Sequence, residues 1–187
     1  MSRRFPSLSS IFAISLLAIF SLSAVPRLVA QTAMAPSSNA VVKWKQLQFL
    51  LGTWEADVVG SNKVQSGGTY SFQTELNGTV LARHSSQDSC KGPTTFDCDH
   101  HDLLYVFHVA SGDGLQAIYF DNEGHVIHYV VTTPTPTSVV FQSEPGPGPQ
   151  FRLTYQLAGT VLHGKFEIAG PGQNSYTSYL EWQGGRK

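Results

Sequence analysis

The sequence predicts an all-β protein, an antiparallel up-and-down barrel of about ten strands preceded by one short helix. After Gly52, short strand-like runs alternate with glycine, proline, asparagine and aspartate. The connections are tight, as at Asn77-Gly78 and Ala158-Gly159. Short turns join neighbouring strands antiparallel, because a parallel neighbour needs a crossover of about a dozen residues. A sandwich would need longer Greek-key crossovers, whereas a closed barrel removes the exposed edges, so we predict the barrel.

The individual elements follow from local patterns. Apolar residues at Val42, Leu47 and 49–51 form a short helical pattern that ends at Gly52, where glycine can take the left-handed cap conformation. Residues 42–187 form the barrel domain, after a small, polar lead-in at 31–41. A barrel of about ten strands is wider than its own side chains easily fill, so an internal cavity is expected. The predicted strands cover residues 54–59, 69–76, 79–85, 102–110, 115–120, 125–132, 138–142, 151–157, 160–169 and 175–183.

Alternation within the strands indicates which side chains line the interior. Tyrosines and aliphatic residues share faces, which predicts an apolar lining with a few hydroxyl groups. A buried guanidinium at Arg83 would need a partner, often a ligand carboxylate, whereas an outward Arg83 would lie in solvent. His128 shares a face with Val126 and Val130 and is a second inward polar candidate. The candidate ligand-binding residues are Tyr70, Phe72, Arg83, Tyr119, His128, Tyr155 and Tyr176, and an ordinary packed core is the alternative.

The first residues have the pattern of an export signal. Arg3 and Arg4 precede an almost wholly apolar run at 11–25, and small residues follow at 28–30, which is the order found in a secretory signal peptide. The apolar run has about 15 residues, short of the roughly 20 that span a bilayer. We therefore predict a signal peptide at 1–30, cleaved near Ala30, and a periplasmic or secreted protein, with a retained membrane anchor as the alternative.

Charge argues against nucleic acid as a partner. Cleavage after Ala30 would remove three of the 12 basic residues and change the net charge from −1 to −4. The remaining chain has no run of five or six basic residues, the pattern typical of nucleic-acid binding. Charged residues make up 13% of the sequence, about half the usual fraction, and serine, threonine, glycine and glutamine supply the polarity.

Residues 47–55, Leu-Gln-Phe-Leu-Leu-Gly-Thr-Trp-Glu, carry a family resemblance. A short apolar helix that runs into Gly-x-Trp resembles the start of the lipocalin-like, or calycin, barrels. The resemblance implies that Trp54 plugs one end of the barrel. The runs at 67–72 and 76–81 look like a bacterial branch of uncharacterised lipocalin-like domains, and the similarity covers the mature chain in order and length.

Nitrobindins, which bind heme, are more distantly similar. Their pattern continues with glycines after the tryptophan, where this chain has Glu55-Ala56-Asp57. They also place a heme-ligating histidine near the last strands. The predicted last strand here has no histidine, and the nearest, His163, lies one strand earlier. We therefore predict no cofactor and keep heme as an alternative.

Cys90 and Cys98 flank a loop at 91–97 that is too long for a tight turn. In an oxidising compartment such a pair usually forms a disulfide, which would stabilise the fold by roughly 2.5 kcal/mol. A metal site is the alternative, because aspartates and histidines crowd residues 97–102. His100 and His101 would point to opposite faces of a strand, so we predict a disulfide, a solvated acidic loop and no metal.

No catalytic arrangement is evident in the sequence. It contains no Gly-x-Ser-x-Gly turn, no phosphate-binding glycine loop and no His-Glu-x-x-His helix. We therefore predict an exported, lipocalin-like protein that binds a small, mostly apolar or amphipathic molecule inside its barrel. Two alternatives stay open. One is a non-hydrolytic enzyme, an isomerase or lyase, that uses the same interior, and the other is an envelope protein that acts through its outer surface.

Overall fold

The structure is a computed structural model that describes residues 43–58, 65–91, 101–110, 112 and 114–187. The chain divides into two units, Met1–Met34 and Ala35–Lys187, and all described residues belong to the second. The predicted signal peptide and the lead-in lie outside the described residues. Within the described part of the chain, no helix is long and apolar enough to cross a membrane.

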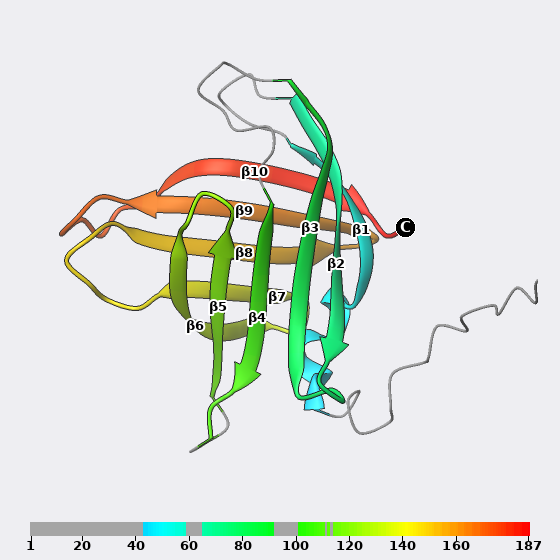
Figure 1. Cartoon of the computed structure of the whole chain (residues 1–187), viewed down its shortest axis with the longest axis horizontal. Helices are drawn as coiled ribbons and strands as arrows, with labels where there is room; N and C mark the ends of the chain where they lie inside the picture. The colour runs from blue at the N-terminus through cyan, green and yellow to red at the C-terminus, as the bar shows by residue number, and fades with distance from the viewer. Residues whose placement is uncertain (1–42, 59–64, 92–100, 111, 113) are drawn as a thin grey trace, which may run out of the picture. The chain divides into compact units, whose positions relative to one another are not determined.

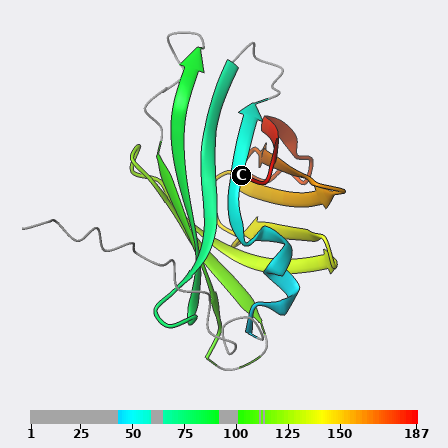
Figure 2. The same cartoon turned by 90° about the vertical axis from the view of Figure 1, so that its right-hand side faces the viewer.

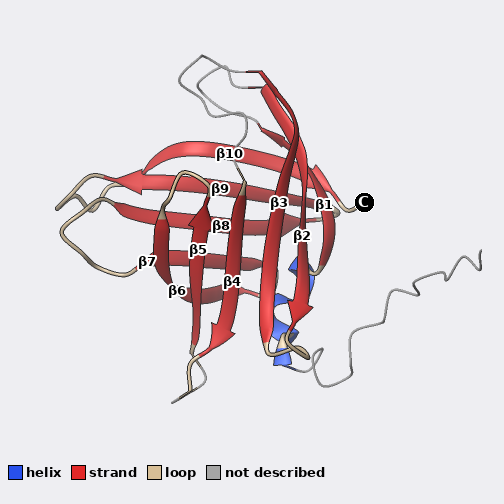
Figure 3. Cartoon of the chain, in the orientation of Figure 1, coloured by secondary structure: helices blue, strands red, loops and turns tan. Residues whose placement is uncertain are grey.

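Ten antiparallel strands form a closed barrel after one short 3-10 helix, as predicted (Figures 1 and 3). The strand set was predictable because turns that contain glycine or proline separate the apolar runs. The helix is η1 (Lys45–Leu50), and the strands are β1 (Gly52–Val58), β2 (Gln65–Glu75), β3 (Val80–Lys91), β4 (Asp102–His108), β5 (Leu115–Asp121), β6 (Val126–Thr135), β7 (Ser138–Ser143), β8 (Gln150–Ala158), β9 (Val161–Ala169) and β10 (Thr177–Gly185).

Each strand pairs with its neighbours in sequence, and the ring closes between the first and the last. Asp57 and Val58 of β1 pair with Gln183 and Trp182 of β10. The other edge of β1 pairs with β2, from Gly52 opposite Phe72 onward. Because every strand has a partner on both sides, the barrel leaves no free sheet edge.

The short helix η1 lies against one end of the barrel, from which the chain runs directly into β1 (Figure 2). Trp44, Leu47 and Leu50 are completely buried there. The indole Nε1 of Trp44 donates to the carbonyl of Gly78, 2.9 Å away in the β2–β3 turn. We call this the helix end of the barrel. The far end carries the turns at 122–124, 144–149 and 170–176.

Strand register assigns each side chain to the inside or the outside. Burial of the inward apolar side chains changes along the barrel axis. Most of those toward the helix end are buried, namely Trp54, Leu81, Val106, Leu115, Val131, Val139 and Leu162, whereas Leu157, opposite Leu162, is half-buried. Those toward the far end are only half-buried, namely Ile127, Phe151, Phe166, Leu180 and Trp182. Solvent therefore reaches the inner wall at the far end.

The helix end is fastened by Arg186. Its guanidinium lies over the Trp54 ring, 4.3 Å from the centroid, and donates to the carbonyls of Leu51 and Phe49. The Trp54 indole donates to the carbonyl of Leu50 at 2.7 Å. Gly52 has a φ of +115°, which favours glycine, and a Cβ there would force the Arg186 guanidinium to shift.

Replacing Arg186 should loosen this end of the barrel. We expect Arg186→Met to lower the free energy of unfolding by about 1–2 kcal/mol, because two charge-assisted hydrogen bonds and a cation–π contact are lost. Urea denaturation followed by far-UV circular dichroism measures the change. The control is Lys187→Met, one residue on. Equal stability of the two variants would show that the Arg186 contacts contribute nothing.

Candidate functional site

The side chain of Arg83 reaches into the centre of the barrel. This residue faces inward from β3 and is 5% exposed. Its Nη1 donates to the hydroxyl of Tyr155 on β8. In a ring of ten strands, β3 and β8 are five steps apart in either direction and therefore lie opposite each other. The Arg83–Tyr155 contact thus spans the interior from wall to wall.

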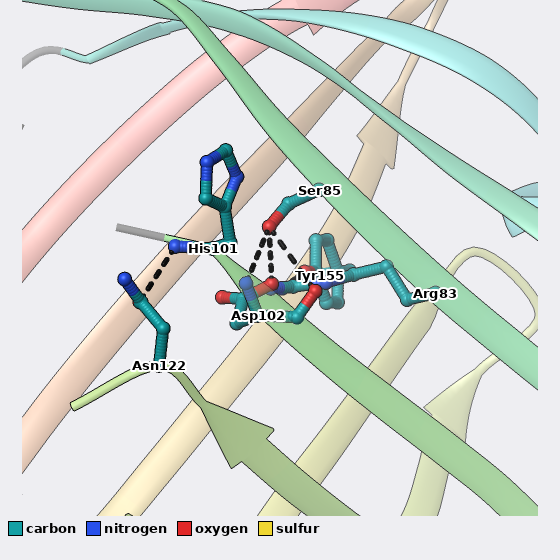
Figure 4. Close-up of polar contacts among 6 residues, drawn as sticks. All are labelled: Arg83, Ser85, His101, Asp102, Asn122 and Tyr155. Carbon is teal, nitrogen blue, oxygen red and sulfur yellow. Dashed lines mark hydrogen bonds and ion pairs between the residues drawn. The ribbon is translucent and has the colours of Figure 1, made fainter. Parts of the chain in front are cut away.

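Asp102, at the start of β4, holds the other arm of the guanidinium. Its Oδ1 accepts from Arg83 Nη2 and also from the hydroxyl of Ser85. Ser85 faces inward two residues after Arg83, directly opposite Asp102 in the β3–β4 register. The Asp102 N–H donates back to the Ser85 hydroxyl at 3.2 Å. These contacts fix the carboxylate on the inner wall (Figure 4).

The start of β4 is also tied to the β5–β6 turn. The backbone N–H of His101 donates to Asn122 Oδ1 at 2.9 Å, and the Asn122 N–H donates to the His101 carbonyl at 3.1 Å (Figure 4). Both residues lie at the far end of the barrel. This pair therefore positions the strand segment that carries Asp102.

Aromatic rings surround the point where Arg83 meets Tyr155. Phe72 and Trp182 stand edge-on to the Tyr155 ring, with centroids 5.3 and 5.7 Å away. Phe141 makes a similar contact at 6.3 Å, and Tyr70 lies at 6.0 Å. The Trp182 indole fits here because Gly164 opposes it, and a Cβ at Gly164 would overlap the ring. The result is an apolar wall around one ion pair.

Arg83 remains a cation in this environment. Burial opposes its charge, but the Asp102 carboxylate and the Tyr155 contact more than offset burial and raise the Arg83 pKa well above its ordinary value. A buried ion pair is weak evidence of net stability, because desolvation costs as much as the attraction returns. Removing either Arg83 or Asp102, however, would leave the other charge buried and unpaired. The pair therefore fixes the arrangement of the core.

The inward tyrosines hold their protons more firmly than free tyrosine does. Burial is the main cause for all four, Tyr70, Tyr119, Tyr129 and Tyr155. It raises the pKa of Tyr155 to about 12, despite the nearby Arg83 charge. The pKa of Tyr119 is raised further by the Asp102 charge. These hydroxyls are therefore neutral hydrogen-bonding groups over the physiological pH range.

Three buried polar atoms of the interior lack a hydrogen-bond partner among the described residues. They are Arg83 Nε and the hydroxyl oxygens of Tyr70 and Tyr129. The Trp182 indole is near the Tyr70 hydroxyl but does not meet hydrogen-bond geometry. A buried polar group without a partner costs about 1–3 kcal/mol, so such groups are rare and call for an explanation. Here one belongs to Arg83, and the Arg83 charge acts on both tyrosine hydroxyls.

Five of the residues proposed from the sequence face this interior: Tyr70, Phe72, Arg83, Tyr119 and Tyr155. Tyr119 is half-buried and lies in the β4–β5 register beside Leu104. Trp54 is 1% exposed and lies at the helix end. The structure thus brings the first five together around the crossing and places Trp54 below it.

The prediction that His128 points inward is wrong. His128 is exposed, as are Val126 and Val130, with which it shares a face. The inward positions of β6 belong to Ile127, Tyr129 and Val131. Both faces of this strand are apolar, so alternation could not decide between them. The same phase error hid Tyr129, which the sequence analysis did not include.

The placement of Tyr176 inside the barrel is also wrong. This residue precedes β10 and lies on the outer surface, where its hydroxyl accepts from Gln142 Nε2 and its ring lies 4.2 Å from the Arg152 guanidinium. Leu180 and Trp182 do face inward. A β-bulge between Ser178 and Leu180 shifts the register, so positions before it have the opposite phase.

Asp102 and Ser85 are the functional candidates that sequence reasoning missed. Asp102 was assigned to a solvated acidic loop, and the partner of Arg83 was expected to be a ligand carboxylate. Strand register is the signal that could have identified both residues. If Arg83 faces inward, Ser85 two residues later also faces inward, and the register places Ser85 beside Asp102, the first residue of the next strand.

The predicted disulfide stays a prediction. Cys98 lies outside the described residues, and for Cys90 the structure describes only the backbone, which pairs with Ser66. Of the acidic run at 97–102, only His101 and Asp102 are described. Asp102 binds Arg83, and its carboxylate is therefore committed to an ion pair.

Asp121, Glu123 and His125 bring their ligand atoms within 4.8 Å of one another in the β5–β6 turn. Asp121 accepts hydrogen bonds from the backbone N–H groups of Glu123 and His125, at 3.1 and 2.8 Å. Its other oxygen lies 2.9 Å from His125 Nδ1. Turn capping by Asp121 accounts for this arrangement without a metal ion.

The histidines fit heme poorly where the structure describes them. His163, the nearest to the last strand, is exposed on the outer face of β9. His84 pairs with Glu75 at 2.7 Å on the outside of the barrel. His108 packs against Trp44 at the helix end, with ring centroids 5.0 Å apart. None of these three is placed to ligate an iron near the Arg83 crossing.

Comparison with known proteins adds no functional assignment. No protein-family model matches this chain. No curated protein matches it either. One similar solved structure is described as EF1p2_mFAP2b bound to DFHBI; the alignment covers 76% of this chain and 98% of the other, at 14% identity and a TM-score of 0.36. A likeness this low does not bear on the function of the chain.

The raised pKa of the inward tyrosines predicts alkaline unfolding. In the unfolded chain Tyr155 loses its proton near its ordinary pKa of 10, whereas in the folded chain it does so near 12. The unfolded state therefore binds fewer protons above pH 10, and stability is lost as the pH rises from 10 toward 12. Absorbance at 295 nm and circular dichroism, recorded together, should show buried phenolates appearing only as the fold is lost. Complete ionisation of all tyrosines with the dichroism retained would contradict this.

Proposed function

We propose that this protein is exported and binds a small, mostly apolar molecule inside its barrel, between the Arg83–Tyr155 crossing and the far end. The observation that carries the proposal is the group of unpartnered polar atoms, Arg83 Nε and the Tyr70 and Tyr129 hydroxyls, at the centre of an apolar wall. A ligand that paired with them would recover the free energy lost on burying them.

The half-buried inner wall at the far end supports the same proposal. Phe151 and Phe166 stack there with centroids 5.9 Å apart and nearly parallel planes. Apolar side chains that face inward and still meet solvent gain from being covered by a ligand, by roughly 25 cal/mol for each Å² removed from water. The sealed helix end offers no such gain, so the ligand would enter from the far end.

Export is the second part of the proposal and rests on the first 30 residues. Arg3 and Arg4, the apolar run and the small residues before Ala30 have the order of a signal peptide. A barrel of this kind outside the cytoplasm would act as a carrier or scavenger of its ligand.

Binding is favoured over catalysis by the direction of the pKa shifts. A general acid or base works best with a pKa near the working pH. The inward tyrosines are shifted upward and away from neutrality, and Arg83 is held as a cation by Asp102. These groups are suited to donating hydrogen bonds rather than to transferring protons.

Two neighbouring residues provide a matched test. Ile127 faces inward near the far end, and His128 faces outward beside it. We expect the purified protein to bind the neutral probe N-phenyl-1-naphthylamine saturably, with a rise in fluorescence. Ile127→Glu should abolish this signal, because a carboxylate would have to be desolvated on the inner wall. His128→Glu should leave it unchanged.

Circular dichroism of both variants verifies folding. Equal loss of the signal in the two folded variants, or no saturable binding by the unsubstituted protein, would contradict interior binding.

A second candidate function is contact through the outer surface. Phe120, Val126 and Val130 are 38%, 56% and 45% exposed on the outer faces of β5 and β6. The outward positions around them in β4 to β6 carry no acidic or basic side chain other than His128. A contact between two copies would therefore bring no like charges together.

This second candidate predicts self-association. Sedimentation would then show a dimer that Ile127→Glu retains and His128→Glu disrupts, since the latter places like charges face to face. A monomer at all concentrations would remove this candidate.

A further inference from the structure

We infer that the ligand presents an uncharged hydrogen-bond acceptor, a carbonyl of the ketone, ester, lactone or quinone kind, to the donors around Arg83. This inference rests on the proposed function and specifies the chemistry of that ligand. Three observations support it. The unpartnered atoms can donate hydrogen bonds, the interior already contains an ion pair, and both the donors and the ion pair are buried.

All three unpartnered groups can donate a hydrogen bond, and the two tyrosine hydroxyls can also accept one. Arg83 Nε carries one N–H and can accept nothing, so it has to be met by an acceptor. The Tyr129 hydroxyl belongs to a side chain that is 1% exposed, and burial keeps its proton in place by raising its pKa. Tyr70, 5% exposed, offers a second hydroxyl. A carbonyl oxygen, which has two lone pairs, can accept from two of these donors at once.

The charges argue against an anionic ligand. The Arg83 cation is already paired with the Asp102 carboxylate. A second inward carboxylate, Asp121, is 4% exposed and lies at the far end, where one of its partners, His125, is 59% exposed. A ligand carboxylate would add a negative charge beside Asp102 that no further inward cation among the described residues balances. An uncharged acceptor meets the donors without that repulsion.

A cationic ligand would not supply the hydrogen-bond acceptor that Arg83 Nε needs. Cations would be attracted by the aromatic faces of Phe72 and Trp182 and by the two carboxylates. An ammonium group carries only donors, however, and would leave the N–H of Arg83 Nε unpaired. The donor pattern and the charges together select a neutral acceptor.

Access to these donors requires movement of their neighbours. Water does not reach Arg83 Nε or the Tyr129 hydroxyl. The half-buried Trp182 stands edge-on to Tyr155 beside the crossing. An entering carbonyl would therefore have to displace a side chain such as Trp182.

Three naphthalene derivatives of similar size test the inference. They are 2-acetylnaphthalene, with a neutral carbonyl, 2-naphthoate, with a carboxylate, and 2-ethylnaphthalene, with neither. Isothermal titration calorimetry on the purified protein gives the dissociation constant of each. We expect the ketone to bind about tenfold more tightly than the hydrocarbon, as one or two hydrogen bonds imply, and more tightly than the carboxylate.

Tyr129→Phe supplies the matching variant. It removes a hydroxyl that has no hydrogen-bond partner among the described residues, so it should not lower the urea midpoint of unfolding. Affinity for the ketone should fall about three- to tenfold, and affinity for 2-ethylnaphthalene should not change. Tyr179→Phe, an exposed tyrosine on β10, is the control and should change neither affinity.

The other outcomes overturn the inference in distinguishable ways. Equal binding of ketone and hydrocarbon would retain interior binding and reject the acceptor. Tightest binding of 2-naphthoate would show that Arg83 selects an anion despite Asp102. Unchanged ketone affinity in Tyr129→Phe would reject the role of that donor. No binding of any of the three compounds would reject the proposed function as well.

Discussion

The contact of Arg83 with Asp102 and Tyr155 is the constraint on which the interior depends. It joins neighbouring strands β3 and β4 to β8 on the opposite wall, at a depth where solvent contributes little. A buried guanidinium has to be paired, so the carboxylate and the phenol are fixed by the same requirement. The aromatic rings that pack on Tyr155 are then positioned by that phenol. A charged centre thus organises an otherwise apolar core.

The same crossing divides the barrel into two functional halves. Below it, η1, Trp54 and Arg186 seal the helix end with buried apolar side chains and capped carbonyls. Above it, the inner wall is still apolar but half-exposed, and the turns rather than a helix surround it. The contacts that stabilise the barrel are concentrated at the helix end, through which no ligand would have to pass. The unpartnered donors lie buried between these two halves.

The fold was predictable from the sequence, whereas the site was predictable only in part. Turn residues separate the strands, so their number and antiparallel order follow from local chemistry. Tyr155 could be placed on the inner face because apolar residues alternate clearly along β8, whereas the pattern of β3 left Arg83 open between the interior and solvent. His128 could not be placed, because β6 is apolar on both faces, and Tyr176 could not, because a bulge in β10 inverts the phase. The pairing of Arg83 with Asp102 depends on register between strands, which a pattern within one strand does not contain.

The most direct test of interior binding is native mass spectrometry of the protein purified from its native source, with no ligand added. The account predicts a reproducible excess mass that leaves on denaturation and that belongs to a small, uncharged, carbonyl-containing molecule. The same spectrum of Ile127→Glu should show the chain mass alone. A bare chain mass for the unsubstituted protein, or an excess mass that Ile127→Glu retains, would contradict the account.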